Sequence, residues 1–222
     1  MIAVVDYHKG NLLSVERGLA AAGAEVLVTD DAGAIARAEG IVLPGVGAFA
    51  DASATMQELG QLEAVRARIA AGVPFLGICL GMHLLFEEGV EGAPDEDDEE
   101  SSHNARGLAV LPGVVVKMPK LAVDGRPFKV PHVGWNTVVP PASGSFACPL
   151  FEGIPAGEYF YFTHSYIVPD GPFAVGMTAH SVAFPSAVQY GKRCFGVQFH
   201  PEKSSDAGAA VLRNFVRIVE GA

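Results

Sequence analysis

The chain has 222 residues, and its 15 lysines and arginines against 25 aspartates and glutamates give a formal net charge of −10. There is no basic cluster to follow a phosphate backbone, which argues against a nucleic-acid partner. No apolar run approaches the ~18 residues of a membrane span. Half of the residues are apolar, which is enough for the core of one domain over residues 1–222.

The chain has three cysteines, Cys79, Cys148 and Cys194, so they cannot all pair, and none lies in a CxxC spacing typical of zinc. The first residues do not resemble a secretory signal peptide, and we therefore expect a reduced, cytoplasmic protein. We expect Cys194 to be a small core residue in an apolar strand, and Cys148 has no neighbour in the sequence that would activate its thiol. We expect no metal and no cofactor.

The first ninety residues alternate short apolar strands with helical patterns. Strands are predicted at residues 2–5, 25–29, 41–43 and 73–79. Helices are predicted at residues 12–22, 32–38 and 52–71, the first capped by Asn11. Short buried strands separated by helices predict a mostly parallel sheet with helices on both faces. In such sheets, functional residues collect at the carboxyl ends of the strands.

Residues 89–106 differ in composition from the segments on either side. Positions 95–100 are all aspartate or glutamate. Because like charges repel and this segment has little to bury, we expect a flexible surface loop. A metal-binding loop is the weaker interpretation, since the run lacks turn glycines at ligand spacing.

Beyond residue 108 the strands are short and separated by proline and glycine, which predicts mixed or antiparallel pairing with a hairpin turn at residues 190–193. A closing helix is predicted over residues 205–220, capped by Ser205 or Asp206. Its apolar face consists of Val211, Leu212, Phe215, Val216 and Val219.

Cys79 lies between a predicted strand and a helical pattern, in the sequence Gly77-Ile78-Cys79-Leu80-Gly81. A Gly-x-Cys-x-Gly segment at such a junction is typical of a nucleophile elbow, because the glycines permit a sharp turn that presents the side chain. The N–H groups at the helix start favour a thiolate and a developing oxyanion. Cys79 is therefore the candidate nucleophile.

A cysteine nucleophile needs a base, and the base needs an orienting group. His200 ends an apolar strand, and Glu202 lies two residues later, on the same side of an extended segment. Glu202 could therefore fix the tautomer of His200. Taken alone, a histidine at a strand end could simply be solvated, and His164 is an alternative base that lacks a nearby acid at this spacing.

Residues 77–82 and 196–202 together resemble the paired signatures of class I glutamine amidotransferases. Further segments are similar to glutaminase subunits of imidazole glycerol phosphate synthase: residues 6–12, 43–49, 131–136, 161–166 and 203–204. The resemblance implies a flavodoxin-like α/β fold, in which a central, mostly parallel sheet has flanking helices and additional mixed or antiparallel strands.

The resemblance also implies roles for particular residues. Cys79, His200 and Glu202 would form a triad that hydrolyses glutamine to glutamate and ammonia through a thioester. The N–H groups of Leu80 and Val46 would bind the oxyanion, and the free subunit would be nearly inactive while the Val46 donor points away. Glutamine would be held by Gly47, His83, His164, Ser165 and Tyr166, although the family usually has glutamine at position 83.

The family implies a heterodimer with a cyclase (synthase) subunit, which uses the ammonia to form imidazole glycerol phosphate in histidine biosynthesis. The positions facing this partner would be Asn11, Trp135, Tyr161 and Lys203. Alternatives are the glutaminase component of another enzyme such as anthranilate synthase, a partner-independent cysteine hydrolase, and a purely binding subunit. An intact Cys79, His200 and Glu202 set argues against the last of these.

Overall fold

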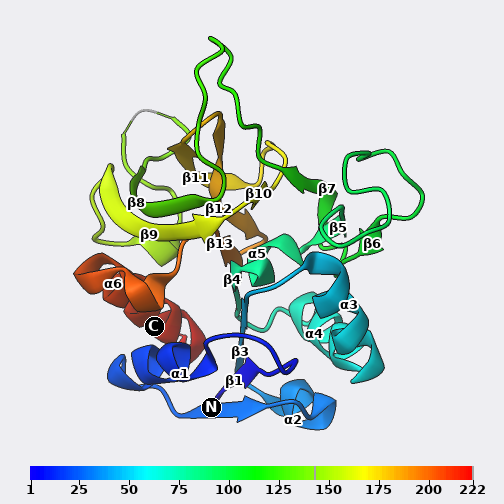
Figure 1. The fold of residues 1–222 in the computed structure, drawn as a ribbon. Helices are drawn as coiled ribbons and strands as arrows, with labels where there is room; N and C mark the ends of the chain where they lie inside the picture. The colour runs from blue at the N-terminus through cyan, green and yellow to red at the C-terminus, as the bar shows by residue number, and fades with distance from the viewer. Residues whose placement is uncertain (143, 222) are drawn as a thin grey trace.

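The computed structural model describes residues 1–142 and 144–221, in which a seven-stranded sheet lies between two layers of helices (Figure 1). Five neighbouring strands are parallel, and the last two at one edge are antiparallel. From the parallel edge the strands are β2 (Val26–Thr29), β1 (Ile2–Val5), β3 (Gly40–Gly45), β4 (Phe75–Cys79), β13 (Cys194–Val197), β12 (Ala183–Tyr190) and β11 (Ala174–Ala179).

Alternation along the strands divides the core into two layers, as β1 illustrates. Ala3 and Val5 pack on one face of the sheet, whereas Ile2 and Val4 pack on the other. The first face is covered by α2 (Ala32–Arg37), α3 (Phe49–Glu58) and α4 (Gln61–Ala70), and the second by α1 (Leu12–Ala21) and α6 (Ser205–Glu220) (Figure 1). Strands buried on both faces explain why the sequence shows continuous apolar runs there.

The single helix expected over residues 52–71 is two helices in the structure, so that prediction was wrong. Gly60 separates them with a left-handed φ of 68°, a conformation that costs glycine little. The next residue, Gln61, is fully buried and donates hydrogen bonds to the carbonyl oxygens of Asp6 and Asp30. These long-range bonds fix the place where α4 starts.

Of the two predicted helix caps, Asn11 is the N-cap residue of α1 as expected but makes no capping bond, and the cap of α6 is a different residue. The Asn11 side chain instead accepts a hydrogen bond from the Ser14 hydroxyl. The predicted bounds of α6 are confirmed, but its N-cap is Ser204 rather than Ser205 or Asp206. The Ser204 hydroxyl donates to the His200 carbonyl oxygen and accepts from the Tyr161 N–H, so it joins the helix to the candidate base.

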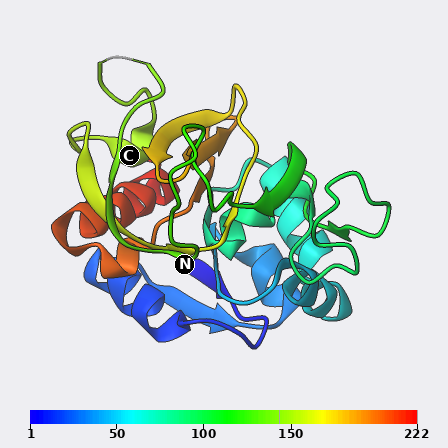
Figure 2. The ribbon, with the colours of Figure 1, turned by 45° about the horizontal axis from the view of Figure 1, so that its top comes forward.

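Two smaller sheets lie at the carboxyl ends of the central strands (Figure 1). One contains β5 (Phe86–Gly89), β6 (Ala105–Arg106), β7 (Leu111–Lys117) and β10 (Tyr166–Ile167), and the other pairs β8 (His132–Val138) with β9 (Glu158–His164). Figure 2 turns this end toward the viewer and shows the two sheets on opposite sides of it. The mixed pairing and the hairpin turn at residues 190–193 agree with the prediction.

The acidic segment leaves the four-stranded sheet at β5 and returns to it at β6, and these two strands pair antiparallel at the base of the segment. Within it, Asp95 accepts hydrogen bonds from Ser101 and His103, and the Asn104 side chain donates to the Glu99 carbonyl oxygen. Internal bonds therefore give the segment a defined path despite its charge. None of the helices in the described part of the chain is long and apolar enough to cross a membrane.

Candidate active site

Cys79 is the last residue of β4 and begins the turn into α5 (Leu80–His83), which is a single helical turn. Its φ of 54° and ψ of −108° are strained for a residue with a Cβ. The flanking glycines allow this turn because a Cβ on Gly77 would overlap the Gly81 carbonyl, and one on Gly81 would overlap the Leu43 carbonyl oxygen. The Gly-x-Cys-x-Gly spacing thus matches a close backbone approach that only glycine permits.

His200 and Glu202 lie where β13 ends, beside β4 in the parallel sheet. His200 Nδ1 is 2.9 Å from Glu202 Oε1, and the side chains are only 4% and 2% exposed. Burial lowers the pKa of His200, but its contacts with Cys79 and Glu202 outweigh burial and raise the pKa to about 9. The Glu202 carboxylate thus fixes a proton on Nδ1 of His200. The other ring nitrogen, Nε2, makes no hydrogen bond of regular geometry and is the atom available to the neighbouring Cys79 sulfur.

A cavity of about 400 Å³ opens beside Cys79, a volume within the range of small-molecule sites. It brings together eight of the residues singled out in the sequence: Val46, Gly47, Cys79, Leu80, His83, His164, Ser165 and Tyr166. His200 and Glu202 do not line it, and His200 instead interacts with Cys79 from the segment after β13. The cysteine thiol donates to the Thr163 carbonyl oxygen across 3.9 Å at the wall of this cavity.

Val46 directly follows β3, whose Gly45 pairs with Cys79 in register. The Tyr7 hydroxyl is buried against Gly45, where an added Cβ would overlap it. Burial raises the pKa of Tyr7 far above its ordinary value and Cys79 adds to this, whereas the Val46 N–H opposes it. The Val46 N–H therefore approaches the Tyr7 oxygen, although without regular hydrogen-bonding geometry.

His164 lines the cavity as a neutral ring. Its Nδ1 donates to the Tyr166 carbonyl oxygen at 2.8 Å, so its Nε2 accepts from Nδ1 of His132 at 3.0 Å. Burial lowers the pKa of His164 to about 3 and that of His132 to about 4. Because both ring nitrogens of His164 are occupied, the arrangement favours His200 over His164 as the base.

Four lining residues were given no role from the sequence: Ala48, Pro131 and Thr163, which lie in segments that carry the family resemblance, and Glu91, which does not. Glu91 supplies the single carboxylate among the described residues that line the cavity. Burial raises its pKa to about 7, with Glu96 and Asp51 adding repulsion. The acidic composition of the surrounding residues concealed it, because β5, which ends two residues earlier, has the sequence Phe-Glu-Glu-Gly and gives no apolar strand pattern.

Three of the four predicted partner-facing residues are adjacent on one surface. Trp135 pairs with Tyr161 across β8 and β9, with ring centroids 6.1 Å apart, and Lys203 Nζ lies 6.0 Å from the Tyr161 ring. Trp135 is 52% exposed, which is high for a tryptophan. Asn11 is also exposed, and it precedes α1, which packs against the turn containing Lys203.

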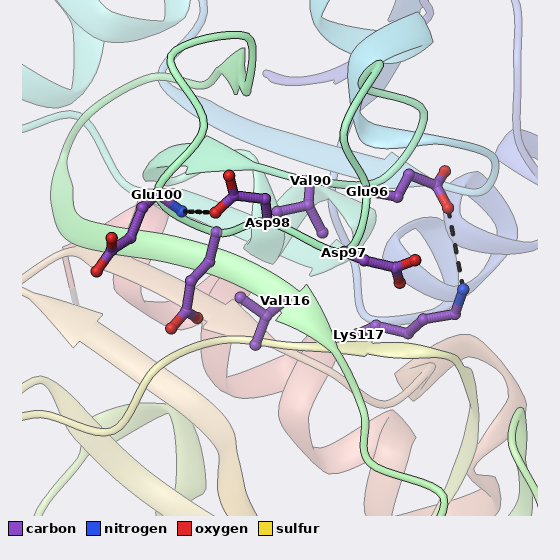
Figure 3. Close-up of a pocket in the computed structure, with 8 residues that line it drawn as sticks. Val90, Glu96, Asp97, Asp98, Glu100, Val116 and Lys117 are labelled. Atoms are coloured by element: carbon purple, nitrogen blue, oxygen red, sulfur yellow. Dashed lines mark hydrogen bonds and ion pairs between the residues drawn. The ribbon is translucent and has the colours of Figure 1, made fainter.

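A second cavity, of about 420 Å³, lies over the acidic segment (Figure 3). Lys117 Nζ is 3.9 Å from Glu96 Oε2 there, the Asp98 carboxylate accepts from the Glu100 N–H, and residues 97–100 are all exposed. In residues 1–142 and 144–221, no group of three histidine, cysteine, aspartate or glutamate side chains is placed to hold a metal ion. Cys148 and Cys194 are both buried, and burial raises the pKa of Cys148 to about 11, which disfavours its thiolate.

Comparison with known proteins places the whole chain in one family. The model described as glutamine amidotransferase class-I matches residues 3–219. The imidazole glycerol phosphate synthase subunit HisH of Moorella thermoacetica is 47% identical over 223 residues, with 100% of this chain and 96% of that protein covered. The HisH subunit of Geobacillus thermodenitrificans is 41% identical, with coverages of 100% and 97%.

Solved structures agree on the fold. A crystal structure described as a glutamine amidotransferase has a TM-score of 0.70 at 18% identity, covering 100% of this chain and 99% of its own. The glutaminase domain of Trypanosoma brucei CTPS, solved with bound acivicin, has a TM-score of 0.61 at 17% identity, with coverages of 99% and 93%. The fold class predicted from the sequence, a largely parallel sheet between helices, is confirmed.

Proposed function

The chain belongs to the class I glutamine amidotransferases, among the HisH subunits of imidazole glycerol phosphate synthase, and we propose that Cys79 is the nucleophile with which it releases ammonia from glutamine. The observation that carries this proposal is the strained Cys79 at the wall of a cavity, backed by the buried His200–Glu202 pair. The family resemblance drawn from the motifs is thereby confirmed at the level of family.

The proposed reaction begins with a thiolate and an imidazolium. With a pKa of about 9, His200 is protonated near neutral pH, and it holds a proton for the leaving group. The Cys79 sulfur attacks the side-chain carboxamide carbon, His200 gives its proton to the departing nitrogen, and ammonia leaves a γ-glutamyl thioester. Water, deprotonated by His200, then attacks the thioester carbon and releases glutamate and the thiolate.

The oxyanion of each tetrahedral intermediate needs preorganised donors. Leu80 offers its N–H directly after the nucleophile, and Val46 offers a second if its peptide turns from Tyr7 toward the cavity. Loss of one such donor typically costs about 3–4 kcal/mol in the barrier. The orientation of this single peptide is therefore sufficient to switch the reaction, which supports the expectation that the free subunit is nearly inactive.

The cavity is suited to the two charged ends of an amino acid. Glu91 would accept the α-ammonium group, whose charge would in turn favour the ionised carboxylate. Gly47, His83 and the segment from His164 to Tyr166 surround the remaining volume and would hold the α-carboxylate and the amide. Glutamine recognition would thus combine residues from β3, α5, β9 and the segment after β5.

We assign the partner surface to the outer face of the β8–β9 ribbon. Its outward side chains, Val133, Trp135 and Tyr159, are all more than half exposed, whereas the inward Phe160 and Phe162 are buried. Exposed apolar side chains in a contiguous stripe are typical of a protein interface. The cyclase subunit of the synthase would bind here in a heterodimer and receive the ammonia.

This surface is also hydrogen-bonded to the triad. The His200 N–H donates to the Tyr161 carbonyl oxygen at 2.9 Å, and the Tyr161 N–H donates to Ser204. A partner that presses on Tyr161 would therefore act on the backbone that carries the base.

The unpaired cysteines Cys79, Cys148 and Cys194 are consistent with the reducing cytoplasm, where we place the complex.

The test is Cys79→Ser, measured in complex with the cyclase subunit. We expect the variant to lose synthesis from glutamine and to retain synthesis from free ammonium salts. Retention of glutamine-dependent synthesis would overturn the nucleophile assignment, and loss of both activities would indicate a structural role for Cys79.

A further inference from the structure

Gln198 links the nucleophile to a cavity residue far away in the sequence. It directly follows β13, is fully buried, and its side chain makes two contacts with opposite polarity. Its Nε2 donates to Cys79 Sγ at 3.6 Å, an ordinary distance for a sulfur acceptor, while its Oε1 lies 2.8 Å from His83 Nε2. One carboxamide therefore joins two residues that line the cavity.

The amide orientation fixes the tautomer of His83. Because a carbonyl oxygen only accepts hydrogen bonds, His83 must carry its proton on Nε2. Burial lowers the pKa of His83 to about 4, so the ring is neutral near pH 7 and cannot donate from both nitrogens. His83 Nδ1 has no partner among the described residues and keeps a lone pair at the cavity wall.

The contact with sulfur favours one charge state of Cys79. A hydrogen bond from an N–H is stronger to an ionised acceptor than to a neutral one, so Gln198 stabilises the thiolate relative to the thiol. If the carboxamide turned over, its oxygen would face the sulfur and oppose the thiolate. After such a rotation His83 could keep its bond to Gln198 only by moving its proton to Nδ1, where the buried donor would have no acceptor among the described residues. His83 therefore favours the orientation in which the amide nitrogen faces the sulfur.

Other titratable groups also face Cys79. His200 approaches the sulfur from the segment after β13, Tyr7 from the segment after β1, and His164 shares the cavity from β9. His200 brings a positive charge, whereas Tyr7 and His164 are neutral near pH 7. Glu91, which lines the same cavity and has a pKa of about 7, is unchanged in every variant compared below. The Gln198 amide therefore acts together with His200 on the sulfur, whose other hydrogen-bond partner among the described residues is the Thr163 carbonyl oxygen.

We propose that the Gln198 carboxamide stabilises the Cys79 thiolate and that His83 is the positioning residue that holds this carboxamide in its donating orientation. The proposal rests on the proposed function, in which Cys79 is the nucleophile. It assigns His83 a role through Gln198 that is separate from contact with glutamine. A glutamine at position 83 could also donate to the Gln198 oxygen, so either residue type fits this role.

The test measures the rate of Cys79 alkylation by iodoacetamide against pH, in the full chain and without glutamine. Cys79→Ser provides the background from Cys148 and Cys194. We expect Gln198→Leu to move the midpoint of the curve upward by about one pH unit, which is about a tenfold loss of reactivity at neutral pH. Gln198→Glu should move it further in the same direction, because a carboxylate repels the thiolate.

Variants of His83 separate positioning from packing. His83→Leu should reproduce part of the upward shift, and His83→Gln should restore the wild-type curve because the donor returns. Circular dichroism establishes whether each variant is folded. If Gln198→Leu does not fold, the proposal is tested by the isosteric Gln198→Glu and by the two His83 variants. The proposal would be overturned if the midpoints of the alkylation curves of Gln198→Glu and His83→Leu lay within about 0.2 pH unit of the wild-type midpoint. Alkylation of Cys79 needs no glutamine turnover. The alkylation result can therefore fail or succeed independently of the Cys79→Ser experiment that tests the proposed function.

Discussion

Replacing Glu202 with glutamine should alter both the rate and the pH dependence of glutamine hydrolysis. The amide retains an acceptor for His200 Nδ1–H, which lies 2.9 Å from the carboxylate, but it removes the negative charge. An opposite charge at such a distance in a buried site shifts a pKa by roughly one to three units. The pKa of His200, now about 9, should fall toward the ordinary value near 6.5.

The size of the effect follows from the protonated fraction. At pH 7.5, about 97% of imidazoles with a pKa of 9 carry the proton, against about 9% of those with a pKa of 6.5. The smaller protonated fraction alone lowers kcat about tenfold. Because the imidazole also loses the carboxylate that orients it, we expect a total loss in Glu202→Gln of roughly 10²–10⁴-fold. The alkaline limb of the rate profile should move to lower pH by one unit or more.

The assay is ammonia release from glutamine by the complex with the cyclase subunit, followed from pH 6 to pH 10. Glu152→Gln is the matched control, because Glu152 also faces a basic side chain, Arg217 at 3.5 Å, but on the exposed surface. An unchanged alkaline limb with wild-type kcat in Glu202→Gln would refute the assigned role of the carboxylate.

The same pair predicts how stability varies with pH. Because the folded pKa of His200 lies above the unfolded value, the folded state binds the proton more tightly, which contributes about 3 kcal/mol. This contribution is complete below about pH 6 and is lost as the pH rises through about 9. Urea unfolding at pH 6 and pH 10 should show a larger decline for the wild type than for Glu202→Gln, and equal declines would contradict the linkage.

Three further substitutions test the elbow, the partner surface and the substrate cavity. Gly81→Ala should destabilise the fold by more than about 3 kcal/mol in urea unfolding, because its Cβ would overlap the Leu43 carbonyl oxygen, and near-wild-type stability would contradict the close approach. Trp135→Ala should weaken cyclase binding at least about tenfold by calorimetry, whereas the fully exposed Val123→Ala should leave it unchanged; equal affinities would exclude this surface. Glu91→Gln should raise KM for glutamine more than it lowers kcat, and a change confined to kcat would argue against ammonium binding.

Local patterns in the sequence were sufficient for the alternating strands and helices. The apolar runs that became β1, β3, β4 and β13 are buried on both faces, so their composition alone identified them. The break at Gly60 could not be predicted in the same way. It depends on hydrogen bonds from Gln61 to the loops after β1 and β2, which are set only when the sheet has formed.

The candidate site shows the same division. Cys79, His200 and Glu202 lie close to strand ends, and adjacent parallel strands bring such ends together, so motif and topology agree. Glu91 was concealed by the acidic residues that follow it, and the Gln198–His83 bond joins positions 115 residues apart. No local pattern encodes a contact of that kind, because it requires the packing of α5 against β13.

The central claim is that Cys79 forms a covalent γ-glutamyl thioester with glutamine. Acid quenching of the complex during turnover, followed by mass spectrometry of the cysteine-containing peptides, measures this directly. We expect one γ-glutamyl group on the peptide containing Cys79, present with glutamine and absent with glutamate. Turnover without an adduct on Cys79, or an adduct on Cys148 or Cys194 instead, would contradict it.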